Sequence, residues 1–315
     1  MTAIRANRLT HLTTWDDHQV GSTVELGGLT VDPATSRGFD RAFVGPRDGA
    51  ESEASTMFLS VSLMRLIVES YLAHAEGLGA PGVDALLRLR PAQLGGELQA
   101  RMTCLAKRPL GSRPEVGLAD IMFDVTRDDG ERVLSWRNKQ FMRIRDPESA
   151  QASAEAPGVA KLQVNAHDEP APTIQLGQHT FTRQQILAFA GAYDPQPFHL
   201  DDRAASKSLF GALCASGWHT CAVWTRLFRD YMIRNREMSP YPTQVSPLPD
   251  FDRLQDLKWI RPVFVDDVIS FSMREIGTST PENGSTARVF EALGIDASDR
   301  PVFQVTAVQR DADIT

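Results

Sequence analysis

The chain has 315 residues, enough for one large domain or two of ordinary size, and its composition of 42% hydrophobic and 23% charged residues is that of a globular protein. Its formal net charge of −7 argues against a nucleic-acid-binding protein, because such domains usually carry a basic face. The three cysteines form no Cys-x-x-Cys pair, so we expect no cysteine-based zinc site, and so sparse a set fits a reducing cytoplasm.

The first residues of the chain carry no targeting signal. Met1 to Asp17 lack the apolar core of a signal peptide, and no uninterrupted apolar run reaches the ~18 residues of a membrane span. We therefore expect a cytoplasmic protein with no membrane partner. Asp16-Asp17-His18 resembles a metal-binding cluster, but adjacent side chains on a strand or turn point in different directions, so we predict no metal there.

The N-terminal half predicts one long helix followed by strands. Ser55 to Leu72 is mostly apolar and has no internal proline, which is typical of a helix buried on most of its faces. Arg90-Pro91 precedes an alternating segment, Leu98 to Cys104, which predicts a half-buried strand. Val133 to Ile144 predicts a further strand.

A connector divides the chain. Asp146 to Ala160 has no aromatic residue and no apolar periodicity, which is typical of a flexible linker. We predict an N-terminal unit over residues 1–145, a linker over 146–165 and a C-terminal unit over 166–315.

The C-terminal half repeats the order of the first. Ala215 to Met232 predicts a second long helix, in which Tyr231 corresponds to Tyr71 of the first. Arg261-Pro262 and the alternating stretch Ile269 to Arg274 correspond in the same way to Arg90-Pro91 and the strand that follows it.

The helix and the Arg-Pro pair are farther apart in the second half than in the first. This difference predicts an insertion, which we assign to Met238–Asp250 because of its proline-rich, turn-like composition. Pro301 to Val308 predicts a closing strand. Each half is thus predicted as an α+β unit in which a curved antiparallel sheet wraps one helix.

Candidate catalytic residues lie between Phe181 and Tyr231. Thr182 and Gln185 form a capping-box pattern that predicts a short helix, which leads into Tyr193-Asp194-Pro195-Gln196-Pro197-Phe198-His199. Two prolines separated by one residue predict a rigid, non-helical loop with Asp194 and His199 at its ends. A carboxylate and an imidazole held in this way suit general acid–base catalysis.

The start of the second long helix offers a complementary group. Ser216-Gly217 is expected to open that helix, where free N–H groups and the positive end of the dipole are exposed. Glycine lets a ligand approach the backbone closely, so this position suits an oxyanion hole for a thioester carbonyl.

These motifs resemble the MaoC-like dehydratases, which include the (R)-specific enoyl-CoA hydratases of the hotdog fold. The resemblance rests on Tyr193 to Asp201, Phe210-Gly211 and Ala215 to Thr220, and is weaker at Trp259-Ile260-Arg261-Pro262-Val263. Together with the internal repeat, it implies a double hotdog.

The resemblance also implies roles for individual residues. Asp194 and His199 would activate water and Gly217 N–H would polarise the thioester carbonyl. The residues expected on the substrate side of the site are Gln196, Ser216, Trp218, Phe210 and Gly211. Gln196 stands where many members of the family have Asn.

The N-terminal half lacks a counterpart of the Asp-Pro-Gln-Pro-Phe-His motif, and the helix alignment puts Met57 opposite Gly217. We therefore expect one active site per chain, with the degenerate half lining the acyl pocket. His219, one turn into the second long helix, is expected to be a core residue.

The expected function is hydration of a 2-enoyl-CoA, or the reverse dehydration. The alternatives are a hotdog thioesterase, against which the absence of an acid before Asp230 on the long helix counts, and a non-catalytic acyl-thioester-binding subunit, against which the presence of both Asp194 and His199 counts. We expect a homodimer, no metal, and no cofactor other than the coenzyme A of the substrate.

Overall fold

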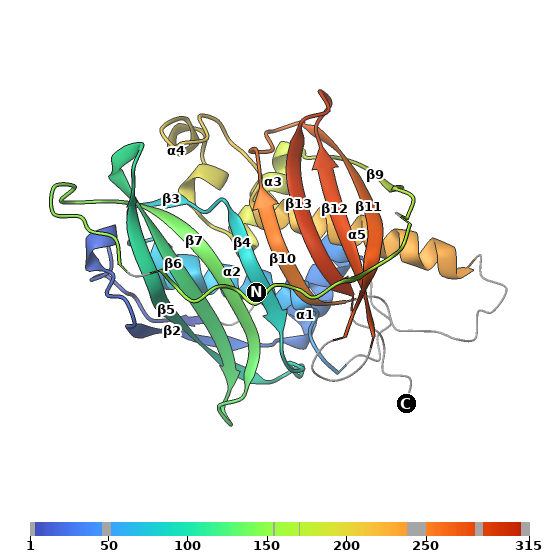
Figure 1. The fold of residues 1–315 in the computed structure, drawn as a ribbon, viewed down its shortest axis with the longest axis horizontal. Coiled ribbons are helices and arrows are strands. Elements are labelled where there is room, and N and C mark those ends of the chain that lie inside the picture. The colour runs from blue at the N-terminus through green and yellow to red at the C-terminus, as the bar shows by residue number, and fades with distance from the viewer. Residues whose placement is uncertain are drawn as a thin grey trace.

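Two similar units, each with a long helix against a curved antiparallel sheet, lie side by side in the computed structural model (Figure 1). The structure describes residues 4–45, 52–153, 155–169, 171–237, 250–280 and 286–309. The predicted insertion Met238–Asp250 lies outside these ranges except for Asp250. The two units, each with a central helix against an antiparallel sheet, confirm the α+β double hotdog predicted from the sequence.

The N-terminal unit follows the predicted order of helix and then strands. The central helix, α2 (Thr56–Ile67), begins at Ser55, whose hydroxyl accepts a hydrogen bond from Phe58 N, and continues as a π-helical turn from Val68 to Leu72. The other elements are β1 (Ile4–Ala6), β2 (Thr23–Thr30), α1 (Pro33–Phe39), β3 (Gly77–Gly79), β4 (Gly82–Arg88), β5 (Glu97–Leu110), β6 (Arg113–Arg127) and β7 (Arg132–Arg143).

The C-terminal unit has the same plan, with α5 (Gly217–Glu237) as its central helix. Its other elements are β8 (Asn165–Ala166), β9 (Ile174–Thr180), α3 (Arg183–Tyr193), α4 (Asp202–Ser206), β10 (Phe251–Trp259), β11 (Val268–Ser279), β12 (Ala287–Ile295) and β13 (Pro301–Gln309). The predicted capping box is present, because Thr182 and Gln185 cap each other at the start of α3.

One continuous sheet joins the two units. Its strands, among the described residues, follow the order β1-β2-β5-β6-β7-β4-β10-β13-β12-β11-β8, with β3 paired to β7 and β9 to β11. The units meet where β4 pairs antiparallel with β10, from Leu87 opposite Arg253 to Gly82 opposite Lys258. Each unit therefore hides one sheet edge against the other.

The internal repeat is visible in the strands and, with one adjustment, in the helices. The shift along the chain that takes Arg90 to Arg261 also takes Glu97, the first residue of β5, to Val268, the first of β11. The two central helices begin at Thr56 and at Gly217. The structural counterpart of Gly217 is therefore Thr56, and the alignment with Met57 was wrong by a single position.

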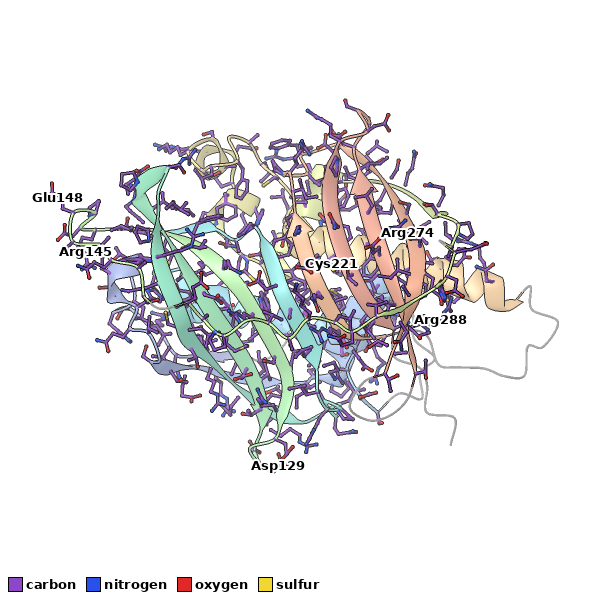
Figure 2. The ribbon with its side chains drawn as sticks, in the orientation of Figure 1. Asp129, Arg145, Glu148, Cys221, Arg274 and Arg288 are labelled. Carbon is purple, nitrogen blue, oxygen red and sulfur yellow. The ribbon has the colours of Figure 1, made fainter. Side chains whose placement is uncertain are left out.

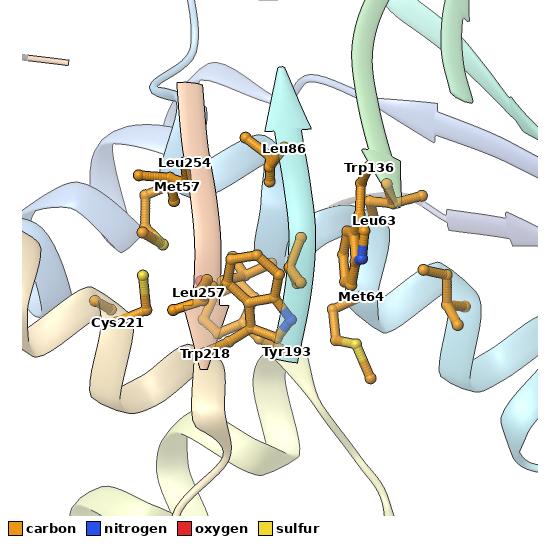
Figure 3. Close-up of a cluster of buried hydrophobic side chains, with 14 of the residues drawn as sticks. Met57, Leu63, Met64, Leu86, Trp136, Tyr193, Trp218, Cys221, Leu254 and Leu257 are labelled. Carbon is orange, nitrogen blue, oxygen red and sulfur yellow. The ribbon is translucent and has the colours of Figure 1, made fainter. Parts of the chain in front are cut away.

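The hydrophobic core lies between the sheet and the central helices. All but one of the residues of α2 are buried, as expected for a helix covered on most sides. Figure 3 shows the core beside β4 and β10, where Met57, Leu86 and Leu254 lie close to one another and Trp218 lies lower in the same cluster.

Charged pairs cover the outer face of the sheet. Figure 2 shows Arg274 and Arg288 on that face, where they pair with Glu291 and Glu275, whereas Cys221 on α5 is fully buried. These exposed pairs contribute little to stability, typically about 0.2–1 kcal/mol each. They maintain a polar outer surface.

The connector between the units crosses the outer face of the sheet (Figure 1). No helix or strand interrupts its described residues between β7 and β8, but contacts hold it in place. Ser153 and Lys107 exchange backbone and side-chain hydrogen bonds, and Arg137 donates to the carbonyl of Pro157. The division at residues 145 and 165 stays a prediction.

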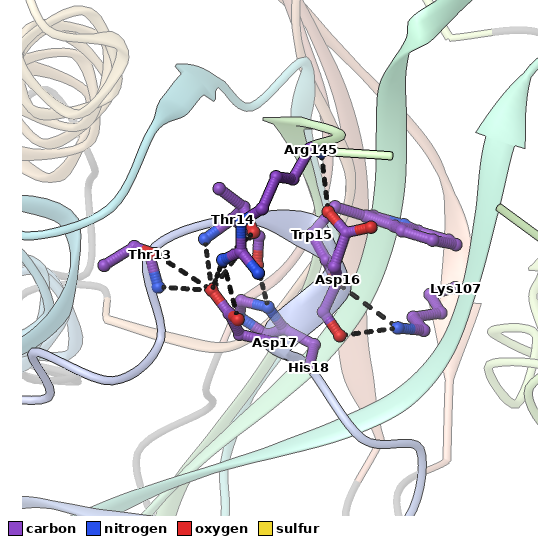
Figure 4. Close-up of polar contacts among 8 residues, drawn as sticks. All are labelled: Thr13, Thr14, Trp15, Asp16, Asp17, His18, Lys107 and Arg145. Carbon is purple, nitrogen blue, oxygen red and sulfur yellow. Dashed lines mark hydrogen bonds and ion pairs between the residues drawn. The ribbon is translucent and has the colours of Figure 1, made fainter. Parts of the chain in front are cut away.

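The Asp16-Asp17-His18 cluster is a structural element. Asp17 accepts hydrogen bonds from Thr13, Thr14 and Arg145 (Figure 4). His18 turns inward instead, with its Nε2 at 2.8 Å from the Tyr71 hydroxyl. The three side chains therefore do not converge. Within the described residues, no group of three or more His, Cys, Asp or Glu side chains is placed to hold a metal ion.

Candidate active site

Asp194 lies at the end of α3, where two hydrogen bonds hold its carboxyl group. Its side chain is buried, with Gln196 Nε2 donating to Oδ1 at 2.9 Å and Ser216 Oγ donating to Oδ2 at 2.6 Å. Because each oxygen accepts a hydrogen bond, the group is bound as a carboxylate would be, and its orientation is fixed.

His199 is held by the backbone of the segment that precedes α5. Its Nδ1 lies 2.8 Å from the carbonyl oxygen of Cys214. A carbonyl can only accept, so we assign the proton of the neutral ring to Nδ1, which leaves the lone pair of Nε2 free. Nε2 lies 3.6 Å from Asp194 Oδ2, which is too long for a direct hydrogen bond.

The loop that carries this pair differs from expectation in one respect. Pro197–His199 forms a 3₁₀ turn, whereas we predicted a non-helical loop. Proline is tolerated in the first turn of a helix, where its missing N–H has no intrahelical partner to lose. The turn brings His199 back towards Asp194.

Gly217 is the first residue of α5, and no acceptor for its N–H is found among the described residues. A β-carbon at this position would lie 2.2 Å from the ring of Trp259, so only glycine allows the indole to pack against the helix start. The free N–H at the positive end of the helix dipole is suited to a developing negative charge.

A cavity of about 340 Å³ joins these groups and is lined by both units. Asp194, His199 and Gly217 line it from the C-terminal unit. Residues of β6, β7 and α2 line it from the N-terminal unit, among them Met64, Ile67, Phe123, Trp136, Asn138 and Gln140. The N-terminal half, which we expected to line the acyl pocket, thus forms part of the wall of this cavity.

Of the five residues expected on the substrate side, three line this cavity: Gln196, Trp218 and Phe210. The ring of Phe210 lies over His199, with centroids 6.3 Å apart. Ser216 and Gly211 are not among the lining residues. Ser216 is buried behind Asp194, and Gly211 faces open space with a φ of +75°.

Two further titratable groups near the site are inert. Burial and the charge of Asp194 raise the pKa of the Cys214 thiol to about 12, so it is not a thiolate nucleophile at neutral pH. Burial lowers the pKa of His219 to about 3, and its ring stacks on Phe189 with centroids 4.6 Å apart. His219 is thus the neutral core histidine that we expected.

The N-terminal unit keeps part of the same arrangement. Ser55 Oγ donates to Asp40 Oδ1 at 2.8 Å, as Ser216 does to Asp194. At the helix start, Thr56 N donates to the carboxylate of Asp250, at 2.9 Å from Oδ2, in the position where Gly217 N–H is free. A carboxylate from the C-terminal unit therefore occupies the counterpart of the proposed oxyanion hole.

Comparisons of the sequence with known proteins match the part of the chain that holds this site. The family model described as "MaoC like domain" matches residues 165–289. YdeM of Bacillus subtilis, an uncharacterized protein, is 29% identical over 107 residues, or 32% of this chain, and the chain spans only 64% of the length of YdeM. The segment matched by the family model contains Asp194, His199 and Gly217.

Solved structures resemble the whole chain in fold. A MaoC domain protein from Chloroflexus aurantiacus superposes with a TM-score of 0.73 at 11% identity, over 97% of this chain and 99% of that one. Rv0216 of Mycobacterium tuberculosis, described as a double hotdog, gives 0.64 at 14% identity over 95% and 99% of the two chains. The fold is thus a double hotdog, and residues 165–289, most of the C-terminal unit, match the MaoC-like family model, in agreement with the sequence motifs.

Sequence reasoning missed several residues of the cavity. Asn138, Gln140 and Trp136 on β7 were not singled out, and Trp259 on β10 was named only as part of the resemblance. A signal was present for the two amides, because they fall at inward-facing positions of a strand whose other inward residues are apolar. The backbone carbonyl of Cys214 carries no such signal.

Proposed function

We propose that the protein adds water to the double bond of a 2-enoyl-CoA, or removes it from the corresponding 3-hydroxyacyl-CoA. The observation that carries this proposal is the separation of 3.6 Å between Asp194 Oδ2 and His199 Nε2, with both groups facing one cavity. One water molecule can bond to both atoms where they cannot bond to each other.

The reaction follows from the positions of three groups. Asp194 and His199 Nε2 accept hydrogen bonds from the water and take up its proton as the hydroxide adds to C3 of the enoyl group. The electron pair of the double bond moves towards the thioester, whose oxygen accepts the Gly217 N–H. The proton then passes to C2, so that one water is consumed and the catalytic groups are restored.

The rim of the cavity suits the entry of a thioester on a long arm. Leu209 and Ile260 are exposed there, by 59% and 40%, and Arg261 lies beside Ile260. Exposed apolar side chains next to a cation fit an arm that is partly apolar and ends in phosphates. The cytoplasmic location and the homodimer stay predictions, and no helix in the described residues is long and apolar enough to cross a membrane.

The decisive experiment uses crotonyl-CoA and follows two signals at once. Loss of enoyl absorbance without release of free thiol supports the hydratase. Release of thiol would instead indicate a thioesterase, against which stand the protonated Cys214 thiol and the fact that Asp194 is the one carboxylate among the described lining residues.

A substitution separates catalysis from binding. In Asp194→Asn we expect turnover to fall at least about 1,000-fold, because the proton acceptor is lost, while the affinity for the acyl-CoA changes little. Turnover close to that of the unmodified protein would remove Asp194 from the mechanism. Binding without any turnover in either protein would favour a non-catalytic binding subunit.

A further inference from the structure

The wall that the N-terminal unit contributes to the cavity is polar at one place. Along β7, the residues that face the central helices are Leu134, Trp136, Asn138, Gln140 and Met142. Asn138 and Gln140 line the cavity and are only 4% and 6% exposed. Two buried carboxamides on an otherwise apolar strand face are expensive to place there, since burying a polar group costs free energy unless it is hydrogen-bonded.

The fold itself does not require an amide at position 138. The shift that takes Arg90 to Arg261 takes Arg88 on β4 to Trp259 on β10. Arg88 pairs with Leu134 and Trp259 pairs with Phe303, so Leu134 and Phe303 are equivalent positions of the repeat. The shift along the chain that takes Leu134 to Phe303 takes Asn138 to Ala307, which is fully buried in the core. The same position on the same strand of the same fold is thus filled by an apolar residue in the C-terminal unit.

Asn138 also has an unsatisfied polar atom. Its Oδ1, which can only accept, is buried without a hydrogen-bond partner among the described residues. Gln140, in contrast, donates to the carbonyl of Gly79 at 3.1 Å. An orphaned amide at the wall of a binding cavity indicates that its partner is supplied by the ligand.

Two indoles near Asn138 have the complementary deficit, because their donors are unsatisfied. The N–H groups of Trp136 and Trp218 find no acceptor, and their rings lie 4.8 Å apart in the cluster that Figure 3 shows. Both residues line the cavity. The unsatisfied atoms are thus one acceptor, Asn138 Oδ1, and two indole N–H donors, so the ligand group that fits them is one that both donates and accepts hydrogen bonds, as a hydroxyl does.

The charges around the cavity restrict the kind of oxygen. Asp194 and His199 lie at the reacting end, and the one Lys or Arg among the described lining residues is Arg261, an exposed side chain whose guanidinium donates to the carbonyl of Pro301. None of the described lining residues on β7 is a cation that could neutralise a carboxylate there. An unpaired buried carboxylate would be strongly disfavoured, whereas a hydroxyl or carbonyl would not.

We propose that the acyl group of the substrate carries a hydroxyl beyond its reacting carbons, and that this hydroxyl donates a hydrogen bond to Asn138 Oδ1. This inference rests on the proposed function, because it assumes that a thioester enters the cavity. Asn138 is then a specificity-determining residue contributed by the half of the chain that lacks the Asp-His pair.

The test compares substrates that differ only in this oxygen. We would measure kcat/KM for hex-2-enoyl-CoA, for its 5-hydroxy and 5-oxo derivatives, and for the carboxylate-bearing glutaconyl-CoA. The proteins are the unmodified chain, Asn138→Ala, which installs the residue of the other repeat, and Lys139→Met as a control on the same strand, whose side chain pairs with Asp84 on the opposite face. Thermal unfolding establishes that each variant is folded.

We expect the unmodified protein to prefer the 5-hydroxy substrate by about tenfold over hexenoyl-CoA and over the 5-oxo substrate, which has no hydrogen-bond donor; this is the size of one hydrogen bond to a buried amide. Asn138→Ala should lose this preference and Lys139→Met should keep it. Dissociation constants measured in the inactive Asp194→Asn background, with and without Asn138→Ala, should show the same pattern if the oxygen is bound in the ground state.

Several outcomes overturn the inference without touching the proposed function. These are turnover of hexenoyl-CoA with no preference for the 5-hydroxy substrate, an equal preference for the 5-oxo substrate, a preference that survives in Asn138→Ala, or best activity on glutaconyl-CoA. An equal loss on all substrates in Asn138→Ala would also overturn it, because the amide would then bind the arm common to them. Absence of turnover with every enoyl thioester would instead refute the proposed function.

Discussion

Ser216 donates a hydrogen bond of 2.6 Å to Asp194, and this contact recurs in the other unit as the bond of 2.8 Å from Ser55 to Asp40. Both serines also receive a backbone N–H at the start of a central helix, from Trp218 and from Phe58. The two pairs therefore have the same structural role, but only one lies beside a histidine and a cavity. This repetition supplies a matched control for the site.

Replacing Ser216 by alanine should lower kcat by about 10- to 100-fold with little change in KM, because a hydrogen bond to a charged group that orients Asp194 is lost. Ser55→Ala removes the same kind of bond and the same helix cap from the unit without the Asp-His pair. It should cost about 1 kcal/mol of stability and leave kcat unchanged. Steady-state kinetics and chemical denaturation of both variants check this, and an equal loss of kcat in the two would show that the effect is not local to the site.

Gly217→Ala should destabilise the protein by about 1–3 kcal/mol, because the new methyl group overlaps the ring of Trp259. The change should also lower kcat/KM, since the displaced indole moves into the cavity next to the Gly217 N–H. In the double variant with Trp259→Leu, the midpoint of thermal unfolding should recover in part. No recovery would mean that the methyl group acts through something other than the indole.

The carboxylate of Asp250 at the start of α2 provides a separate prediction. Asp250→Ala leaves Thr56 N–H and the Thr56 hydroxyl without this acceptor, so we expect a loss of about 1–2 kcal/mol in the free energy of unfolding. Because this helix start lies in the unit without the Asp-His pair, kcat should stay within about twofold of the original value. A large loss of turnover in a variant that is folded would contradict the assignment of a single active site per chain.

His219 should make stability depend on pH in the acidic range. Its folded-state pKa is lowered from 6.5 to about 3 by burial, so the unfolded chain binds a proton there before the folded chain does. The neutral ring therefore contributes stability that is fully present above pH 6.5 and is lost as the pH falls towards 3, by up to about 1.4 kcal/mol per pH unit.

The variant His219→Phe, which keeps an aromatic ring on Phe189, should have a shallower pH dependence over that range. Phe181→Leu is the control, because it alters the same aromatic cluster without altering a titratable group. It should shift the curve of stability against pH downwards without changing its slope. Identical slopes for His219→Phe and the original protein would show that His219 is not the titrating group.

Much of the fold could be predicted from the sequence because both halves carry the same short sequence patterns in the same order. Arg90-Pro91 and Arg261-Pro262 mark the same gap before β5 and β11, and the uninterrupted apolar runs mark α2 and α5. The alignment of the helices was wrong by a single position because their apolar faces are nearly continuous, so that no periodic signal fixes it. Ser55 and Ser216, the residues that precede the two helices, would have given the right alignment.

The composition of the site could be predicted only where it is local in sequence. Asp194 and His199 share one loop, and Gly217 begins the helix that follows. Asn138 reaches the cavity from the other unit, through the pairing of β7 with β4 and of β4 with β10. Such a contact depends on tertiary structure between distant parts of the chain, which patterns within one segment do not encode.

The pairing of β4 with β10 limits how this protein can be divided into separate units. If residues 166–315 were produced alone, β10 would become an open edge with unpaired backbone groups, which is a known route to aggregation. The cavity would also lose the wall that carries Asn138. We therefore expect truncation to the unit with the Asp-His pair to fail, because the other unit covers the edge of β10 and forms part of the cavity wall.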